Sequence, residues 1–341
     1  MTGDTRAIVT ALYVYPVKSC RGIELDQSEL VATGLKYDRL FVIGRPGAED
    51  GGRTARFVSQ RQEPMLSQLV PELDTANDVL RLRSKRHPEL TPLTLPLSVP
   101  ADRSADTQVR IWADIVPAID LGGEAWLATA LDGLVSYPMH VYRMPTTFER
   151  VVDPERAFLT SNFDSIVGFA DAFPLLLTSM QSLAELNRRM VAQSSASHQV
   201  PMSRFRPNVV VDALNPGSVE QHQQHQRRSL EPFEEDAWKR IRIGSTATFV
   251  VAKPCSRCRI TTTDQDTGQV DTAYREPLRT LETFRKHPLG TLFGQNLAIE
   301  NARQSGQRLQ VGDVVQVLAW QREESSLWWW QRLYRRFWGC A

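Results

Sequence analysis

The sequence predicts a mainly β protein with some helices (α+β), in which an N-terminal β-barrel domain precedes a second, β-barrel-like domain. Short runs of β-branched and aromatic residues recur along the chain between turn residues, as the strands of small barrels do. Few stretches have the spacing of an amphipathic helix. The length of 341 residues suggests two domains or more, with enough core to fold without disulfides.

In the first half, four runs predict strands and one stretch predicts a helix. The strands are expected at residues 7–17, 40–44, 79–82 and 108–112, in a small barrel over roughly the first 120 residues. A helix is expected after Gly122 and Gly123, because apolar residues there recur at helical spacing: Trp126, Leu127, Ala130 and Leu131. Residues 143–165 are polar and irregular, which is typical of a connector.

The second half begins with a strand–turn–helix unit. FPLLL at residues 173–177 predicts a buried strand, and residues 178–190 predict a helix with a capping box of Thr178 and Gln181. Further strands are expected at 209–211, 247–251 and 309–318, the last with a turn at Gly312 and Asp313. The second domain is therefore also expected to be rich in strands.

Charge and cysteine content exclude several classes of protein. Forty Lys and Arg residues stand against 39 Asp and Glu residues, and this net charge of +1 rules out a bulk nucleic-acid binder but not a local basic site. Four cysteines exclude a disulfide scaffold. We find no secretory signal and no apolar run of transmembrane length, so we expect a cytoplasmic protein with reduced thiols.

The sharpest motif is PCSRCRI at residues 254–260, a C-x-x-C pair formed by Cys255 and Cys258. Three cations flank the pair: Lys253, Arg257 and Arg259. Nearby cations favour the thiolate form of a cysteine, and the thiolate is the form that acts as a ligand or nucleophile. The flanking cations therefore favour the ligand or nucleophile form of these two thiols.

Three interpretations of this pair remain open from the residues alone. A zinc site needs four ligands, and the remaining cysteines, Cys20 and Cys340, are isolated in the sequence. A thioredoxin-like dithiol needs a helix after the pair, whereas the β-branched ITTT follows it. Two half-buried structural cysteines are the third interpretation, and spacing alone favours it.

Two further segments offer hydrogen-bond donors to an anion. YPVKSCRGI at residues 15–23 places Lys18, Ser19 and Arg21 after a strand, where a loop can bring donors together. SRFRPN at residues 203–208 places two arginines and Asn208 beside the strand VVVD, and arginines are planar bidentate donors. The structural alternatives are a solvated turn and a surface ion-pair cluster.

Taken together, these segments resemble the MOSC-domain proteins, whose name comes from the C-terminal domain of molybdenum-cofactor sulfurase. YPVKSCRGI, YDRLFVI and SQRQEPML are similar to the N-terminal β-barrel domain that precedes a MOSC domain. Five further blocks resemble the MOSC domain itself: SMQSLAELNRRM, RFRPNVVVD, CSRCRITTTDQDTG, EPLRTLETFR and LFGQN. Within this family the chain resembles the mitochondrial amidoxime-reducing component and its bacterial counterparts, which reduce N-hydroxylated compounds at a molybdenum cofactor.

The resemblance implies a domain plan and a cofactor site. The N-terminal barrel domain would span residues 5–125, a helical or irregular connector 126–165, the MOSC domain 166–320 and a tail 321–341. Molybdopterin, with its phosphate and polar pterin edge, would lie in the crevice between the domains. The matching cofactor-binding positions are Lys18, Ser19, Arg39, Ser179, Arg206 and Asn208. Cys258 would be the metal ligand and catalytic thiolate, and Cys255 would have no ligand role.

The resemblance also implies an activity. The chain would be a molybdenum-cofactor oxidoreductase that reduces small N-hydroxylated compounds, with electrons from a separate donor protein of the ferredoxin, flavodoxin or cytochrome type. Asp264 and Asp266 follow the cysteines but serve equally well as turn residues. The alternative is a carrier of a metal–sulfur cofactor or of sulfur on Cys258, without redox catalysis of its own. Stoichiometric molybdenum in the purified protein would favour the enzyme, and a cysteine persulfide without molybdenum would favour the carrier.

Two polar or amphipathic segments carry separate expectations. His222 and His225 lie in a Gln-rich loop without other ligands, so we do not expect a metal there. Residues 325–341 carry four of the eight tryptophans, three arginines and no acidic residue, a composition typical of an interfacial helix. We expect a peripheral membrane or partner contact through this tail; packing against the protein's own barrel and docking of the electron donor are the alternatives.

Overall fold

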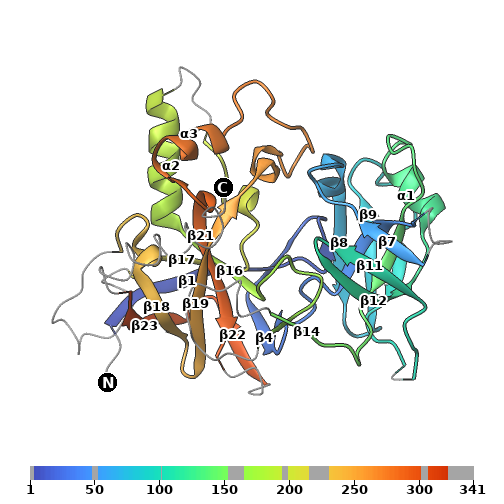
Figure 1. Cartoon of the computed structure of the whole chain (residues 1–341), viewed down its shortest axis with the longest axis horizontal. Coiled ribbons are helices and arrows are strands. Elements are labelled where there is room, and N and C mark those ends of the chain that lie inside the picture. Colours follow the sequence, from blue (N-terminus) through green and yellow to red (C-terminus); the bar gives the residue numbers. More distant parts are fainter. Residues whose placement is uncertain are drawn as a thin grey trace, which may run out of the picture.

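Two closed β-barrels lie side by side along the long axis of the molecule (Figure 1). The computed structural model describes residues 4–47, 53–100, 102–152, 165–193, 199–214, 230–300 and 306–321. The barrel on the right of Figure 1 comes from the first half of the chain, and the barrel on the left comes largely from the second half. The predicted fold class, mainly β with some helices in two barrels, is confirmed.

The larger barrel is a ring in the order β16-β17-β1-β23-β18-β19-β21, which closes because β21 also pairs with β16. Its strands are β1 (Asp4–Val14), β16 (Leu175–Ser179), β17 (Val209–Ala213), β18 (Trp238–Ile243), β19 (Ala247–Arg257), β21 (Gly290–Ile299) and β23 (Val314–Trp320), with β3 (Ile23–Leu25) and β20 (Lys286–His287) added at the sides. Inward-facing apolar side chains of these strands fill one core, in which Leu12, Leu177 and Trp238 are fully buried.

The smaller barrel is a ring in the order β13-β12-β11-β7-β6, closed by pairing of β13 with β6 and flanked by β2. Its strands are β2 (Val17–Lys18), β6 (Phe41–Arg45), β7 (Thr54–Phe57), β11 (Thr107–Ile111), β12 (Asp114–Asp120) and β13 (His140–Arg143). A sheet of β8 (Leu69–Asp74), β9 (Val79–Ser84) and β10 (Leu93–Pro96) shares its apolar core, since Leu80 and Leu82 cluster with Phe41 and Ile43.

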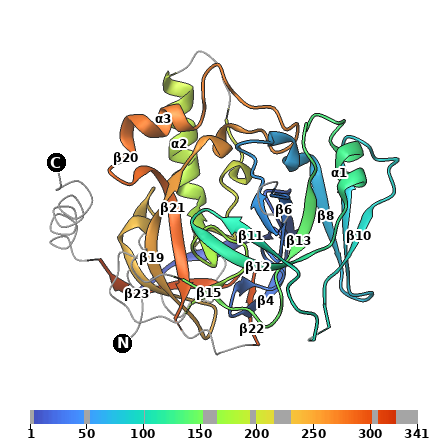
Figure 2. The ribbon, with the colours of Figure 1, turned by 45° about the vertical axis from the view of Figure 1, so that its right-hand side comes forward.

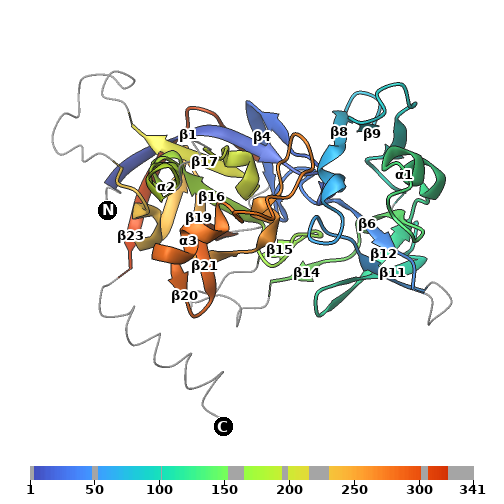
Figure 3. The same ribbon diagram turned by 90° about the horizontal axis from the view of Figure 1, so that it is seen from above.

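Two small strand groups lie outside the barrels. β4 (Gln27–Val31) pairs with β5 (Gly34–Leu35) and with β22 (Gln307–Gln310), which joins the two ends of the chain. β14 (Arg150–Val151) and β15 (Ile166–Val167) pair with each other and lie between the barrels (Figures 1 and 3). The expected connector therefore contributes to the contact between the two barrels.

The first strand lies in the larger barrel rather than in the smaller one, where we expected it. β1 pairs with β17 on one side and with β23 on the other, so that Asp4 stands opposite Val317. The chain then crosses to the smaller barrel at β2. A local pattern predicts a strand but not its neighbours, because the partners of β1 are distant in sequence and are selected by the burial that pairing achieves.

Three helices complete the described fold: α1 (Glu124–Ala130), α2 (Met180–Gln193) and α3 (Leu278–Phe284). α1 follows Gly123, whose φ of +96° favours glycine, and it buries Leu127 and Ala130 as predicted. α2 and α3 cover one end of the larger barrel (Figures 1 and 2). The predicted apolar stripe of α2 is confirmed, because Leu183, Leu186 and Met190 are buried.

The capping box predicted for α2 is wrong. The helix begins at Met180, and the hydroxyl that accepts the Gln181 N–H (3.2 Å) belongs to Ser179. Thr178 is the fourth residue of β16, and its buried hydroxyl has no hydrogen-bond partner in the described part of the chain. The Gln181 amide donates to Asp212 of β17 instead (2.7 Å), since tertiary contact offers it a charged acceptor.

The remaining expectations divide into those that the structure tests and those that it does not. The turn at Gly312 and Asp313 is confirmed between β22 and β23. His222, His225 and the tail at 325–341 lie outside the described residues, so their interpretations stay predictions. Among the described residues, no helix is both long and apolar enough to cross a membrane.

A buried carboxyl joins α2 to the larger barrel. Glu235, in the 3₁₀ turn η5 (Glu234–Ala237), is fully buried, and its Oε1 accepts the Ser182 hydroxyl of α2 (2.7 Å). Its Oε2 has no partner among the described residues, and the neighbouring Asp236 is bonded to Gln295 and Arg285. Burial, and then the charge of Asp236, raise the pKa of Glu235 to about 7.

This arrangement predicts that the free energy of unfolding falls as pH rises. Because the pKa of Glu235 is raised from 4.5 to about 7, the folded state holds a proton that the unfolded state releases over that interval. The stabilisation that the folded state gains from holding this proton is fully present below pH 4.5. It is lost as pH rises through 7, which lowers the free energy of unfolding by an amount on the order of 3 kcal/mol.

The test is urea unfolding of the wild type and Glu235→Gln from pH 4.5 to 8. We expect the amide variant to gain stability relative to wild type as pH rises through this window. Glu149→Gln, which makes the same change at an exposed glutamate, is the matched control. Parallel pH profiles for wild type and Glu235→Gln would contradict the assignment.

Candidate functional site

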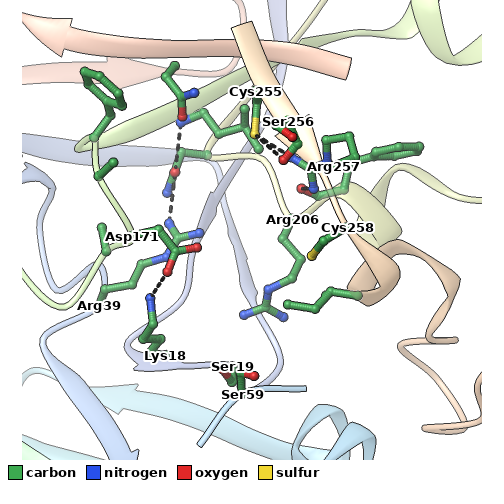
Figure 4. A pocket seen from close by; sticks show the side chains of 18 of the residues that line it. Lys18, Ser19, Arg39, Ser59, Asp171, Arg206, Cys255, Ser256, Arg257 and Cys258 are labelled. Carbon is green, nitrogen blue, oxygen red and sulfur yellow. Dashed lines mark hydrogen bonds and ion pairs between the residues drawn. The ribbon is translucent and has the colours of Figure 1, made fainter. Parts of the chain in front are cut away.

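A cavity of about 350 Å³ opens between the two barrels. The smaller barrel contributes the turns around Lys18 and Arg61 to its wall, and the larger barrel contributes the segments around Arg206 and Cys258. A third wall comes from the residues between β15 and β16, including Asp171. Figure 4 shows side chains that point from separate segments toward a common space, among them Lys18, Asp171, Arg206 and Cys258.

The cavity is strongly cationic. Among the described residues that line it, six are basic and one is acidic: Lys18, Arg39, Arg61, Arg206, Lys253 and Arg257 against Asp171. The chain as a whole carries a net charge of only +1, so positive charge is concentrated at this place. A concave site with this excess of cations attracts and holds an anionic ligand.

Arg39 and Arg206 are gathered around one aromatic ring. Both guanidinium carbons lie 4.3 Å from the centroid of Tyr15, which follows β1 directly. Arg39 is also paired with Asp38 (2.5 Å), whereas Arg206 has no ion pair within the described residues and donates only to Gln265 (3.3 Å). Burial, together with the charge of Arg39, lowers the pKa of Arg206 to about 10, so it stays a cation at neutral pH.

The side-chain amide of Asn208 holds Arg39 in place, because its oxygen and its nitrogen are both already hydrogen-bonded within the protein. Its Oδ1 accepts from Arg39 (2.9 Å) and from the backbone N–H of Leu176 (3.2 Å), and its amide donates to the Tyr13 carbonyl (3.1 Å). The amide therefore ties the strands β1, β16 and β17 to the arginine of the other domain. Its role in the free protein is to orient a donor.

Lys18 is buried against Asp171, the one acidic residue among the described residues that line the cavity. Its Nζ lies 2.5 Å from Oδ1 of Asp171, which also accepts the indole N–H of Trp112 (2.8 Å). Burial lowers the pKa of Lys18, and the charge of Asp171 opposes that shift. Although desolvation works against it, the charge of Lys18 holds the pKa of the Asp171 carboxyl well below its usual range.

Cys258 receives a hydrogen bond from the other domain. It follows the end of β19 and precedes the 3₁₀ turn η6 (Arg259–Thr262), and its Sγ accepts from Nε of Arg61 (3.1 Å). Cys255 instead accepts from Nη1 of Arg257 (2.9 Å). Both cysteines are free and half-buried, and both line the cavity. The geometry thus gives each thiol its own cation.

The extended backbone separates the two thiols. β19 runs through Arg257, and Cys258 is itself extended, with φ of −130° and ψ of −179°. Three residues of extended chain span roughly 10 Å, whereas bridged cysteines need Cα atoms within about 7 Å. The dithiol interpretation therefore fails without a backbone movement. For the zinc interpretation, no group of three or more His, Cys, Asp or Glu ligands occurs within the described residues.

The structure brings together all but one of the seven predicted site residues. Lys18, Ser19, Arg39, Arg206, Asn208 and Cys258 line the cavity. Ser179 does not: it is fully buried at the end of β16, where its hydroxyl caps α2. Only the beginning of that strand reaches the cavity, at Leu175 and Leu176, and three further residues carry the chain about 10 Å away.

Arg61, Trp112 and Asp171 are among the cavity residues that were not singled out from the sequence. Arg61 lies inside the block SQRQEPML, but its contact with Cys258 joins positions 197 residues apart. Trp112 and Asp171 have no local signal beyond a strand end and a polar loop. Of these three residues, only Trp112 is marked by its backbone, which has positive φ (55°) as do Ser19, Arg39 and Arg206.

The segment after Cys258 holds the two barrels together. Asp264 accepts the N–H groups of Asp266 and Thr267, which makes it a turn residue, and it pairs with Arg204. Asp266 pairs across the interface with Arg21 (2.6 Å). Gln265 exchanges amide hydrogen bonds with Gln60 (2.9 and 3.1 Å). Of the alternatives left open for Arg21 and Arg204, the structure therefore shows ion pairs.

Comparison with known proteins gives matches over both barrels. The MOSC N-terminal beta barrel domain matches residues 6–133, and the MOSC domain matches residues 164–316. Mitochondrial amidoxime reducing component 2 of Homo sapiens is 31% identical over 90% of this chain and 82% of its own length. Mitochondrial amidoxime-reducing component 1 of Mus musculus is 29% identical over 91% and 82%, respectively. Molybdenum cofactor sulfurase of Oryza sativa subsp. japonica is 29% identical over 89% of this chain, which spans 35% of that protein.

The ring of Tyr15 is expected to stabilise the two arginines that it contacts. Tyr15→Phe keeps the ring and loses the hydroxyl bond to the Pro207 carbonyl (3.1 Å), a loss of about 1 kcal/mol. Tyr15→Leu also loses both cation–π contacts and leaves two like charges against an aliphatic side chain, at about 2 to 4 kcal/mol. Urea unfolding of both variants measures the difference, and equal losses would refute the role of the ring.

Proposed function

Because the chain belongs to the MOSC-domain proteins that carry the MOSC N-terminal beta barrel domain, we propose that it is a molybdenum-cofactor oxidoreductase that reduces N-hydroxylated compounds. One observation carries the proposal: six cations surround a cavity into which Cys258 faces as a half-buried thiol. Relatives named as amidoxime-reducing components support the reaction class.

The side chains present fit such a cofactor. Molybdopterin is an anion with a phosphate and a polar pterin edge, and Lys18, Arg39 and Arg206 offer charge-assisted donors to both. Arg206 is the strongest candidate, because within the described residues its charge is not matched by any carboxylate. Cys258 offers the soft thiolate that suits molybdenum, and the dithiolene of the cofactor would supply further ligands.

The bound cofactor would supply a redox centre that accepts the oxygen of an N–OH group when two electrons and two protons are delivered, leaving the N–H compound and water. The residues of this chain have separate tasks in that reaction. Arg61 holds the sulfur of Cys258 from the side of the smaller barrel (3.1 Å). Asp171 positions the ammonium group of Lys18 at the wall, and Asn208 keeps Arg39 in place.

The electrons would come from a separate donor protein of the ferredoxin, flavodoxin or cytochrome type, and the proposed location is the cytoplasm, with a peripheral membrane contact through residues 325–341. A carrier of a metal–sulfur cofactor or of sulfur is the second candidate. It is favoured by the similarity to molybdenum cofactor sulfurase and by the free thiol of Cys258 in the cavity, which could hold transferable sulfur.

The two cysteines give the decisive test of the proposed ligand. Cys258→Ala should abolish reduction of N-hydroxylated compounds and lower molybdenum content, because it removes the protein's thiolate ligand. Cys255→Ala should retain both, since it loses only one contact with Arg257.

Metal analysis and reduction assays are run on protein produced in a host that makes molybdopterin. Equal loss in both variants, with zinc in the wild type, would defeat the molybdenum assignment. A persulfide on Cys258 without molybdenum in the wild type would favour the carrier.

Arg206→Ala and Lys18→Ala should lower cofactor content rather than change substrate preference. Each removes a charge-assisted bond, which corresponds to about tenfold to a hundredfold in affinity. Molybdenum and pterin per polypeptide are the measurements. Arg83→Ala and Lys36→Ala are matched controls, because both side chains are exposed and paired with glutamates away from the cavity. Full occupancy with altered substrate choice in the first two variants would count against the site.

A further inference from the structure

The turn that begins at Trp112 joins the strands β11 and β12 at the cavity. Its backbone has a φ of +55°, in the left-handed region where hairpin turns normally use Gly, Asn or Asp. A bulky residue is a genuine outlier in this conformation. Glycine would serve the turn better, so the fold itself gives no reason for an indole there, and the reason must lie in what the side chain does.

The indole is held in a fixed orientation. Its N–H donates to Asp171 (2.8 Å), and its ring meets Phe57 edge to face, with centroids 4.9 Å apart. The guanidinium of Arg61 lies 4.5 Å from its centroid. Despite these contacts the residue remains 45% exposed and lines the cavity. An aromatic ring that is held in place and faces a cavity is available to contact a flat ligand there.

This surface stands beside the reaction centre. Arg61 contacts the Trp112 ring and also donates to the sulfur of Cys258 (3.1 Å), so one guanidinium separates the indole from the proposed metal ligand. The groups proposed to hold the cofactor are better covered: Lys18 and Asn208 are 7% and 1% exposed. Trp112 therefore lies toward the open side of the cavity, where a substrate must enter.

Building on the proposed function, we infer that Trp112 is a specificity-determining residue that receives the flat ring of aromatic N-hydroxylated substrates, while Asp171 and Phe57 act as positioning residues for its indole. A flat ring could also be the pterin of the cofactor. The substrate ring and the pterin ring would both stack on the indole. Loss of the indole would weaken substrate binding in the first case and lower cofactor content in the second.

The test compares an aromatic with an aliphatic substrate on protein loaded with molybdenum. Benzamidoxime and acetamidoxime carry the same N–OH group, and a chemical reductant replaces the electron donor. Trp112→Gly removes the ring and relaxes the turn, and Trp112→Phe restores an aromatic surface. We expect Trp112→Gly to raise KM for benzamidoxime about tenfold, to change acetamidoxime less than about twofold and to leave molybdenum content unchanged. Trp112→Phe should recover most of the loss.

Binding without turnover gives a second readout. Calorimetry with benzamidoxime in the absence of reductant should give a Kd that rises about tenfold in Trp112→Gly. Tyr274→Ala, an exposed aromatic outside the cavity, should leave it unchanged. A fall in molybdenum content would assign the ring to the cofactor and overturn the inference, and so would equal effects on the two amidoximes.

Failure of the proposed function would look different. If the molybdenum-loaded wild type reduces neither amidoxime, the proposed reaction class is wrong. A Kd for benzamidoxime that rises in Trp112→Gly would still support the role of the indole in binding a flat ring. If the amidoximes are reduced but the Kd for benzamidoxime is the same in wild type and Trp112→Gly, the reaction class stands and the proposed role of Trp112 is wrong.

Discussion

The structure depends on confining positive charge at the contact between two barrels. Arg39 and Arg206 approach the same Tyr15 ring at 4.3 Å each, and Lys18 is buried close by. Such charges repel one another and lose hydration on burial, so each needs a partner. Asp38 and Asp171 pair with Arg39 and Lys18. Arg206 has the ring, a neutral amide and no carboxylate among the described residues, and this unmatched charge is available to a ligand.

The chain path explains how the two barrels stay in register around these charges. β1 belongs to the larger barrel, and the chain crosses directly from it to β2 of the smaller barrel, so Tyr15 and Lys18 stand at the crossing. The segment after Cys258 makes further contacts between the barrels. Gln265 is hydrogen-bonded to Gln60, and Asp266 is ion-paired with Arg21. A shift of one barrel against the other would break both sets of contacts. The site is therefore pre-organised by the same interactions that join the domains.

Backbone strain is concentrated at the same place. Ser19, Arg39, Trp112 and Arg206 are four of the nine described non-glycine residues with positive φ, and all four line the cavity. Left-handed conformations of bulky residues persist only where surrounding contacts over-determine them. Here those contacts are the ring of Tyr15, the amide of Asn208 and the carboxylate of Asp171. The left-handed backbone at these four residues costs folding free energy. In return, it fixes the direction in which each side chain points into the cavity.

The sequence by itself determined the fold class and the helices α1 and α2, because strand and helix periodicity is local. It also indicated six of the cavity residues, through the resemblance of YPVKSCRGI, YDRLFVI, RFRPN and CSRC to the motifs of one family. Only the tertiary structure decided the partners of β1, the exclusion of Ser179 and the inclusion of Arg61, Trp112 and Asp171. Pairing, capping and contacts across a domain boundary join residues up to about 300 positions apart, as Asp4 and Val317 do. A local pattern carries no information about such distances, since the choice among partners is made by the burial and charge pairing that the whole chain achieves.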